Sequence, residues 1–109
     1  MKQEGYVLLF STAGNEQEAR AIATHLVSHH LVACVNIVPS IHSIYWWKNG
    51  VTEDNEVLLL MKSKRENIAE IEKAVRSLHS YETPELIAVP LDYGFSEYLN
   101  WIDAALKGK

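Results

Sequence analysis

The side chains in this sequence that can bind a metal or attack a substrate are few and lie far apart. The 109 residues include one cysteine, Cys34, five histidines and fourteen acidic residues. Thiolate, imidazole and carboxylate groups are the usual protein ligands of transition metals. No spacing of the closed structural-zinc type is present, and a single cysteine excludes an internal disulfide. The sequence therefore predicts no closed structural zinc site.

His79 is the best-placed histidine for a metal, because Tyr81, Glu82 and Glu85 follow it in one polar segment. An imidazole and carboxylates in such a loop can converge on a borderline or soft divalent ion. Cys34 lies inside an apolar run, which is typical of a buried core thiol. The alternative role for Cys34 is as a Cu(I) or redox ligand, which requires an exposed, ionised sulfur.

The other histidines fit structural roles. His29 and His30 are adjacent, and neighbours on a helix point about 100° apart, so one ion cannot easily use both. Solvated histidines at the C-terminal end of a helix are the simpler interpretation. His25 sits beside the apolar stripe of the same predicted helix, and His42 lies on a predicted hairpin, where it serves packing.

Motifs of common enzymes and of nucleic-acid binding are absent from the sequence. It has no G-x-S-x-G, H-E-x-x-H or P-loop string, so we expect no enzymatic activity and no organic cofactor. The net charge of -4 disfavours nucleic acid and anionic membranes as partners. Apolar runs do not exceed five residues, against the ~20 of a membrane helix, and the start, MKQEGY, lacks a secretory apolar segment. We expect a cytoplasmic protein with a single domain over 1–109.

Hydrophobic periodicity predicts the element order β-α-β-β-α-β followed by a terminal helix. Right-handed crossovers make this an α+β, ferredoxin-like split βαβ sandwich, with two helices on one face of a four-stranded antiparallel sheet. Asn15 is predicted to cap the first helix, and Ser63 and Glu66 have the capping-box spacing for the second. The predicted elements are a strand over 6–11, a helix over 16–30, a hairpin over 32–62 with its turn at 49–50 and a polar loop at 52–55, a helix from about 64, a strand over 86–91 and a helix from about 96.

The predicted hairpin is too long for a domain of this size. Fourteen residues from Val32 to Tyr45 would reach roughly 45 Å at ~3.3 Å per residue. A domain of this length has a radius of gyration of roughly 13 Å and spans about 35 Å. The distal half is apolar and aromatic, and no helix of the chain is left to cover it, so association between copies is favoured. The alternative is that Pro39 bends the tip back onto its own domain. The expected interface residues are Ile44, Tyr45, Trp46 and Trp47.

Four segments resemble the CutA (CutA1) family of divalent-cation tolerance proteins. They read LVACVNIVPSIHSIYWWKNG, EVLLLMKSK, HSYETPELIAVPLDYG and EYLNWI, and the match runs from about Tyr6 to Leu106. The resemblance implies a ferredoxin-like protomer that forms a tight homotrimer through its long strands, similar in architecture to PII signalling proteins. It also implies a non-enzymatic role in tolerance and binding of divalent metal ions, copper among them.

The copper ligands of the family are only partly present. Family members described as copper-binding use a thiol early in the chain and a His pair in the loop after the second helix. The corresponding positions here are Ser11 and Leu78, which leaves His79. The resemblance therefore implies, at most, weak binding of copper or another divalent metal, at the surface or between subunits, with His79 as the remaining ligand. Cys34 is the second candidate ligand, because of its thiol chemistry.

The resemblance also implies a cleft between subunits, lined by Lys62, Tyr81, Glu85 and Trp101. This cleft supports a second hypothesis, that of a PII-like signalling or scaffolding trimer that binds a small metabolite there and passes its state to a partner. An unrecognised hydrolase is a third hypothesis, which no motif supports.

Overall fold

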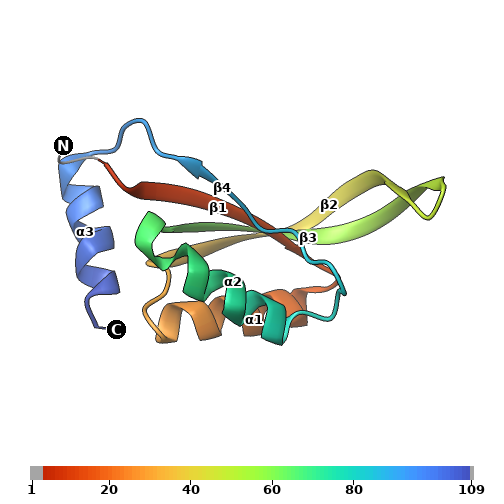
Figure 1. Cartoon of the computed structure of the whole chain (residues 1–109), viewed down its shortest axis with the longest axis horizontal. Coiled ribbons are helices and arrows are strands. Elements are labelled where there is room, and N and C mark those ends of the chain that lie inside the picture. Colours follow the sequence, from red (N-terminus) through yellow and green to blue (C-terminus); the bar gives the residue numbers. More distant parts are fainter. Residues whose placement is uncertain (1–3, 109) are drawn as a thin grey trace.

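A four-stranded antiparallel sheet in the order β2-β3-β1-β4 forms the centre of the molecule (Figure 1). The computed structural model describes residues 4–108. This architecture confirms the predicted ferredoxin-like fold. The elements, in chain order, are β1 (Tyr6–Ala13), α1 (Glu16–Ser28), β2 (Cys34–Trp47), β3 (Gly50–Lys64), a 3-10 turn (Arg65–Asn67), α2 (Ile68–Leu78), β4 (Ile87–Pro90) and α3 (Ser96–Leu106).

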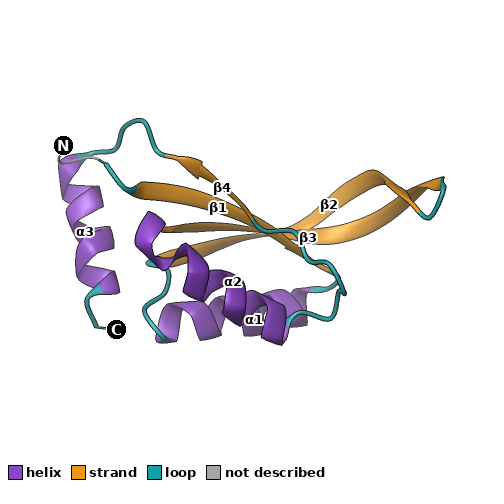
Figure 2. Cartoon of the chain, in the orientation of Figure 1, coloured by secondary structure: helices purple, strands orange, loops and turns teal. Residues whose placement is uncertain are grey.

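Helices α1 and α2 cover one face of the sheet (Figure 2). Strand residues alternate between faces, and Val7 and Leu9 of β1 are buried against the two helices. Ile22 of α1 and Ile71 of α2 are fully buried on the same side. Burial of each such side chain contributes about 1.5–3 kcal/mol, so this layer is the main core.

Helix α3 covers only one end of the opposite face. Leu99 and Ile102 of α3 pack with Tyr6 in a small second cluster. The Tyr6 hydroxyl donates to Asp103 at 2.7 Å, and Lys64 pairs with the same carboxylate at 3.1 Å. Burial and the neighbouring Asp103 raise the pKa of Tyr6 to about 12. The rest of this face, which we call the open face, has no helix over it.

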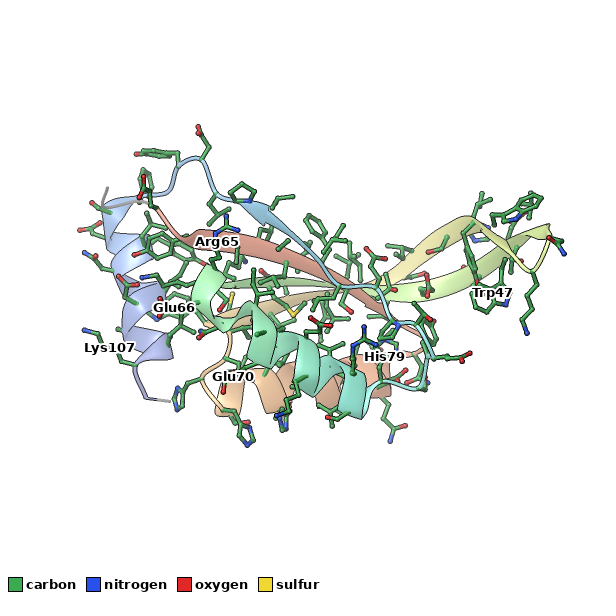
Figure 3. The ribbon with its side chains drawn as sticks, in the orientation of Figure 1. Trp47, Arg65, Glu66, Glu70, His79 and Lys107 are labelled. Carbon is green, nitrogen blue, oxygen red and sulfur yellow. The ribbon has the colours of Figure 1, made fainter. Side chains whose placement is uncertain are left out.

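The distal part of the β2–β3 hairpin extends well beyond the helices, and Figure 3 shows Trp47 near its tip. The principal extents of the molecule are 45 × 26 × 23 Å. Trp46 is 69% exposed and Ile44 63% exposed, so the tip does not fold back onto the domain. The register shifts between Val38 and Ile41, as the position of Pro39 predicts. The predicted overhang is therefore confirmed.

The hairpin turn is tighter than the sequence predicts. Lys48 and Asn49 both have positive φ, 49° and 67°, and they alone connect Trp47 to its partner Gly50. Two central residues with positive φ define a type I′ turn, whose twist matches that of the flanking strands. The predicted turn at 49–50 is therefore one residue too late. The predicted polar loop at 52–55 is wrong, because these residues pair with β2 throughout.

The predicted capping box is also wrong. Ser63 pairs with Val7 on the helix-covered side of the sheet and is fully buried. Its hydroxyl donates to the Leu31 carbonyl at 2.6 Å, and the Asn67 amide donates to the same oxygen at 3.2 Å. Ser63 therefore belongs to the core, and α2 begins only at Ile68, after the 3-10 turn. Asn15 does cap α1, since its side chain accepts from the Glu18 amide at 2.8 Å.

Candidate functional site

A groove of about 410 Å³ lies between the β2–β3 hairpin and the loop between α2 and β4. We call it the acidic groove, because four carboxylates lie among its walls together with two tyrosines and a tryptophan. Its lining residues are Thr12, Ser43, Tyr45, Trp47, Asp54, Glu56, Tyr81, Glu82, Thr83 and Glu85.

The α2–β4 loop is fixed to strands β1 and β3 by three side-chain hydrogen bonds. The Ser11 hydroxyl donates to the Glu85 carbonyl at 2.7 Å. The Tyr81 hydroxyl donates to Glu56 at 2.6 Å across the groove. The His79 Nε2 lies 2.6 Å from the Thr12 carbonyl oxygen. Ser11, at the position where the family resemblance leads one to expect a thiol, thus has a structural role here.

Glu18, in the first turn of α1, also fixes the α2–β4 loop. Its carboxylate accepts from the Ser80 amide at 2.6 Å and from the Ser80 hydroxyl at 3.1 Å. Burial opposes ionisation of Glu18, but the hydrogen bonds from Ser80 and from the Gly14 amide outweigh it and lower the pKa of this carboxyl. The loop that carries Tyr81 into the groove therefore depends on a charged Glu18.

Both ring nitrogens of His79 are occupied. A carbonyl oxygen can only accept, so Nε2 carries the proton that is donated to Thr12. Nδ1 then holds the lone pair and accepts from the Tyr81 amide at 3.1 Å. The side chain is fully buried. A metal could bind His79 only after one of these hydrogen bonds is broken.

The acidic groove is strongly negative. Asp54, Glu56, Glu82 and Glu85 lie in no ion pair within residues 4–108. Burial, the hydrogen bond to Glu56 and the surrounding carboxylates all raise the pKa of Tyr81. Uncompensated carboxylates beside aromatic faces favour a cationic guest and disfavour an anionic one.

Cys34 lies elsewhere, on the open face. Its sulfur is 3.6 Å from the Lys62 ammonium and 3.9 Å from the Tyr98 hydroxyl. Tyr98 in turn packs against Trp101, with ring centroids 5.5 Å apart. Cys34 is half-buried and lies outside both apolar cores, so its interpretation as a core thiol is wrong. The alternation of β2 places it opposite the face that the helices cover.

The structure brings only some of the predicted site residues together. Of the expected cleft residues, Tyr81 and Glu85 line the acidic groove, whereas Lys62 and Trp101 belong to the cluster around Cys34. Whether these two groups meet across a subunit boundary stays a prediction.

The two candidate metal ligands, Cys34 and His79, are far apart within one chain. Cys34 pairs with Lys62 of β3, which in turn pairs with Leu8 of β1, whereas His79 contacts Thr12 of β1. These two positions on β1 are roughly 13 Å apart. The part of the chain that the structure describes holds no cluster of three or more His, Cys, Asp or Glu that could bind a metal.

The sequence alone does not identify the groove residues that lie on the hairpin. Asp54 falls in the segment predicted as a loop, and Glu56 comes just after it, in the part predicted as a strand. Both lie on one face of β3, because alternate residues of a strand share a face. Glu18 lies near the start of the predicted helix over 16–30, and the sequence indicates no contact for it beyond that helix. Its hydrogen bonds to Ser80 join residues 62 positions apart, and no local pattern signals such a contact.

The fold and the exposed hairpin define the class of this protein as a ferredoxin-like domain with an extended β2–β3 arm. The family model described as "CutA1 divalent ion tolerance protein" matches residues 7–105. The chain belongs to this family, which confirms the resemblance seen in its motifs. None of the described helices is long and apolar enough to cross a membrane.

Relatives from several kingdoms are similar along most of this chain. The divalent-cation tolerance protein CutA of Thermus thermophilus is 45% identical over 91 residues, which cover 84% of this chain and 88% of the relative. Protein CutA of Mus musculus is 43% identical over 93 residues, 85% of this chain but 52% of its own length. The chain thus spans about half the length of the mammalian relatives it matches.

Solved structures of relatives have the same fold. The periplasmic divalent cation tolerance protein CutA of Archaeoglobus fulgidus superposes with a TM-score of 0.90 at 36% identity, covering 93% of this chain and 98% of that one. CutA1 of Oryza sativa gives a TM-score of 0.92 at 33% identity and covers 96% of both chains.

We predict that the α2–β4 loop loosens in acid. Because the folded-state pKa of Glu18 is lowered, its stabilising contribution is complete above the unfolded value and is lost as pH falls through the folded one. The Ser80 amide resonance, followed by NMR from pH 7 to pH 2, should shift as Glu18 protonates. Glu18→Gln should abolish that step and cost ~1 kcal/mol of stability at neutral pH. Glu16→Gln, an exposed neighbour on the same helix, is the control, and an identical Ser80 titration in Glu18→Gln would contradict the prediction.

Proposed function

We propose that this chain acts as a homotrimeric, non-enzymatic protein of divalent-metal tolerance in the cytoplasm, with copper as a weakly bound ligand. Membership of the CutA1 divalent ion tolerance family supports the tolerance role. The names of the relatives, which describe divalent-cation tolerance, agree with it. The exposed hairpin is the observation that carries the assembly.

The uncovered apolar surface of one chain is too extensive for a lone domain. Ile44, Trp46 and Trp47 are 63%, 69% and 50% exposed on the hairpin. Ile87 and Val89 of β4 are also exposed, at the opposite edge of the sheet. Contiguous apolar patches and free strand edges of this kind are association sites in stable proteins.

The asymmetry of the sheet favours a closed ring of subunits. Its two edges are different strands, β2 and β4, so a contact between the hairpin of one copy and the β4 side of the next is heterologous. Heterologous contacts close into cyclic oligomers when the rotation permits. The family resemblance supplies the number three. Such an assembly would bury Ile44, Tyr45, Trp46 and Trp47 and would bring neighbouring chains to the acidic groove.

Trp46→Asp should weaken the assembly, because a charge without a partner would be buried in the interface. Sedimentation velocity at micromolar concentration should show a trimer for the native chain and smaller species for the variant. Ala21→Asp, which adds the same charge to the exposed face of α1, is the matched control and should remain trimeric. A native chain that sediments as a monomer would overturn the proposal of a trimer.

We propose that copper binds at Cys34 and at His79, which are separate positions in the fold of one chain. The Cys34 sulfur is half-exposed, and His79 would exchange its hydrogen bond from Tyr81 for the metal. Titration calorimetry with Cu²⁺ should give lower affinity for Cys34→Ser and for His79→Ala than for the native chain. His42→Gln, which removes an imidazole from the hairpin, should bind as the native chain does. Heats that do not change in either test variant would remove that residue from the metal site.

The acidic groove supports a second candidate function, that of a signalling trimer that binds a small metabolite. The walls supply carboxylates and aromatic rings and no basic residue, so the ligand would be an amine-bearing cation rather than a nucleotide. Amine metabolites should raise the melting temperature of the native protein but not that of Glu56→Gln, because ligands stabilise only the state they bind. Stabilisation by nucleotides instead would contradict this charge argument.

A further inference from the structure

The C-terminal end of α1 carries a second histidine arrangement, which involves His25 in the last turn and His29 at the C-cap rather than the adjacent pair His29 and His30. Residues four apart on a helix lie on one face. The rings of His25 and His29 are stacked, with centroids 4.0 Å apart and an interplanar angle of 24°. His29 is exposed and His25 is half-buried, at the edge of the helix that faces solvent.

A hydrogen bond to the backbone fixes the tautomer of His29. Its Nδ1 lies 2.9 Å from the His25 carbonyl oxygen. Because a carbonyl can only accept, the proton is on Nδ1 and the lone pair is on Nε2. Histidines that bind metals usually donate their other ring N–H to a carbonyl or carboxylate in this way, which orients the ring. His29 therefore presents Nε2 as a ready ligand, in contrast to His79.

The His25 ring has to turn out of the stack to complete the pair, because the lone pairs of stacked imidazoles lie in nearly parallel ring planes. Within residues 4–108 the His25 ring makes no hydrogen bond and no ion pair, and it stacks on the ring of His29. The pair also lies at the C-terminal end of α1, where the helix dipole favours positive charge.

We propose that His25 and His29 form an exposed two-histidine site for a borderline divalent cation such as zinc or copper. Imidazole nitrogens suit these ions, and histidines four apart on a helix bind zinc in metalloproteases. With only two protein ligands, water fills the remaining positions, so the ion is exchangeable rather than structural. The site lies within one chain and is independent of the trimer, of the acidic groove and of Cys34 and His79.

Zinc titrations of helix variants test the spacing itself. Zinc is the probe because it does not oxidise the Cys34 thiol. His29→Ala should lower the affinity for zinc at least tenfold. Even the loss of a residue that only hydrogen-bonds to a metal ligand costs about tenfold in metal affinity, and His29 is a proposed ligand itself. Ala21→His combined with His29→Ala should restore binding, because it rebuilds a pair four residues apart with His25. Thr24→His combined with His29→Ala has the same number of histidines at the wrong spacing and should not restore it.

NMR distinguishes this site from any other. Zinc should shift the imidazole ¹⁵N resonances of His25 and His29 in the native chain, while circular dichroism confirms that each variant keeps its helices. Equal zinc affinity in the native chain and His29→Ala, or in the two double variants, would overturn the proposal. Copper binding at Cys34 or His79 would survive all three variants, so failure here leaves the proposed function intact.

Discussion

Two helices can cover only one face and one half of this sheet, and that constraint shapes the rest of the molecule. Strands β2 and β3 continue beyond the helical layer, with Trp46 and Trp47 exposed at their far end. Helix α3 shields only the part of the open face around Tyr6. The energy of burial that stabilises the core is thus unavailable to the hairpin within one chain. Association between copies is the physical means by which a protein shelters such a surface.

The acidic groove follows from the same long hairpin. Asp54 and Glu56 reach the α2–β4 loop because β3 runs far enough to pass it. The loop then has its position fixed by partners on three elements, Ser11 and Thr12 on β1, Glu18 on α1 and Glu56 on β3. Every one of these bonds joins residues distant in sequence. These hydrogen bonds therefore fix the loop that forms one wall of the groove.

Their hydrogen bonds make His79 and His29 differ in how available they are to a metal ion. His79 is buried, and both its nitrogens are used to hold the loop. His29 uses its Nδ1 on the backbone of its own helix and leaves Nε2 to solvent. The residue that a family pattern would select for metal binding is thus the less available one. The exposed pair on α1 is formed by helix geometry alone.

The element order, the helix-covered face, the overhanging hairpin and its bulge near Pro39 could be predicted from the order of the residues, because they depend on periodicity and chain length. The family resemblance places Tyr81 and Glu85 in a predicted cleft between subunits, and within one chain both line the acidic groove. Three-dimensional packing was needed to show that Ser63 is a core residue, that Asp54 lies on a strand and that Glu18 holds the loop. Strand register and contacts between distant residues set these features, and neither leaves a local trace in the sequence. The free nitrogen of His29 was likewise decided in three dimensions, because a tautomer depends on which atom its ring meets.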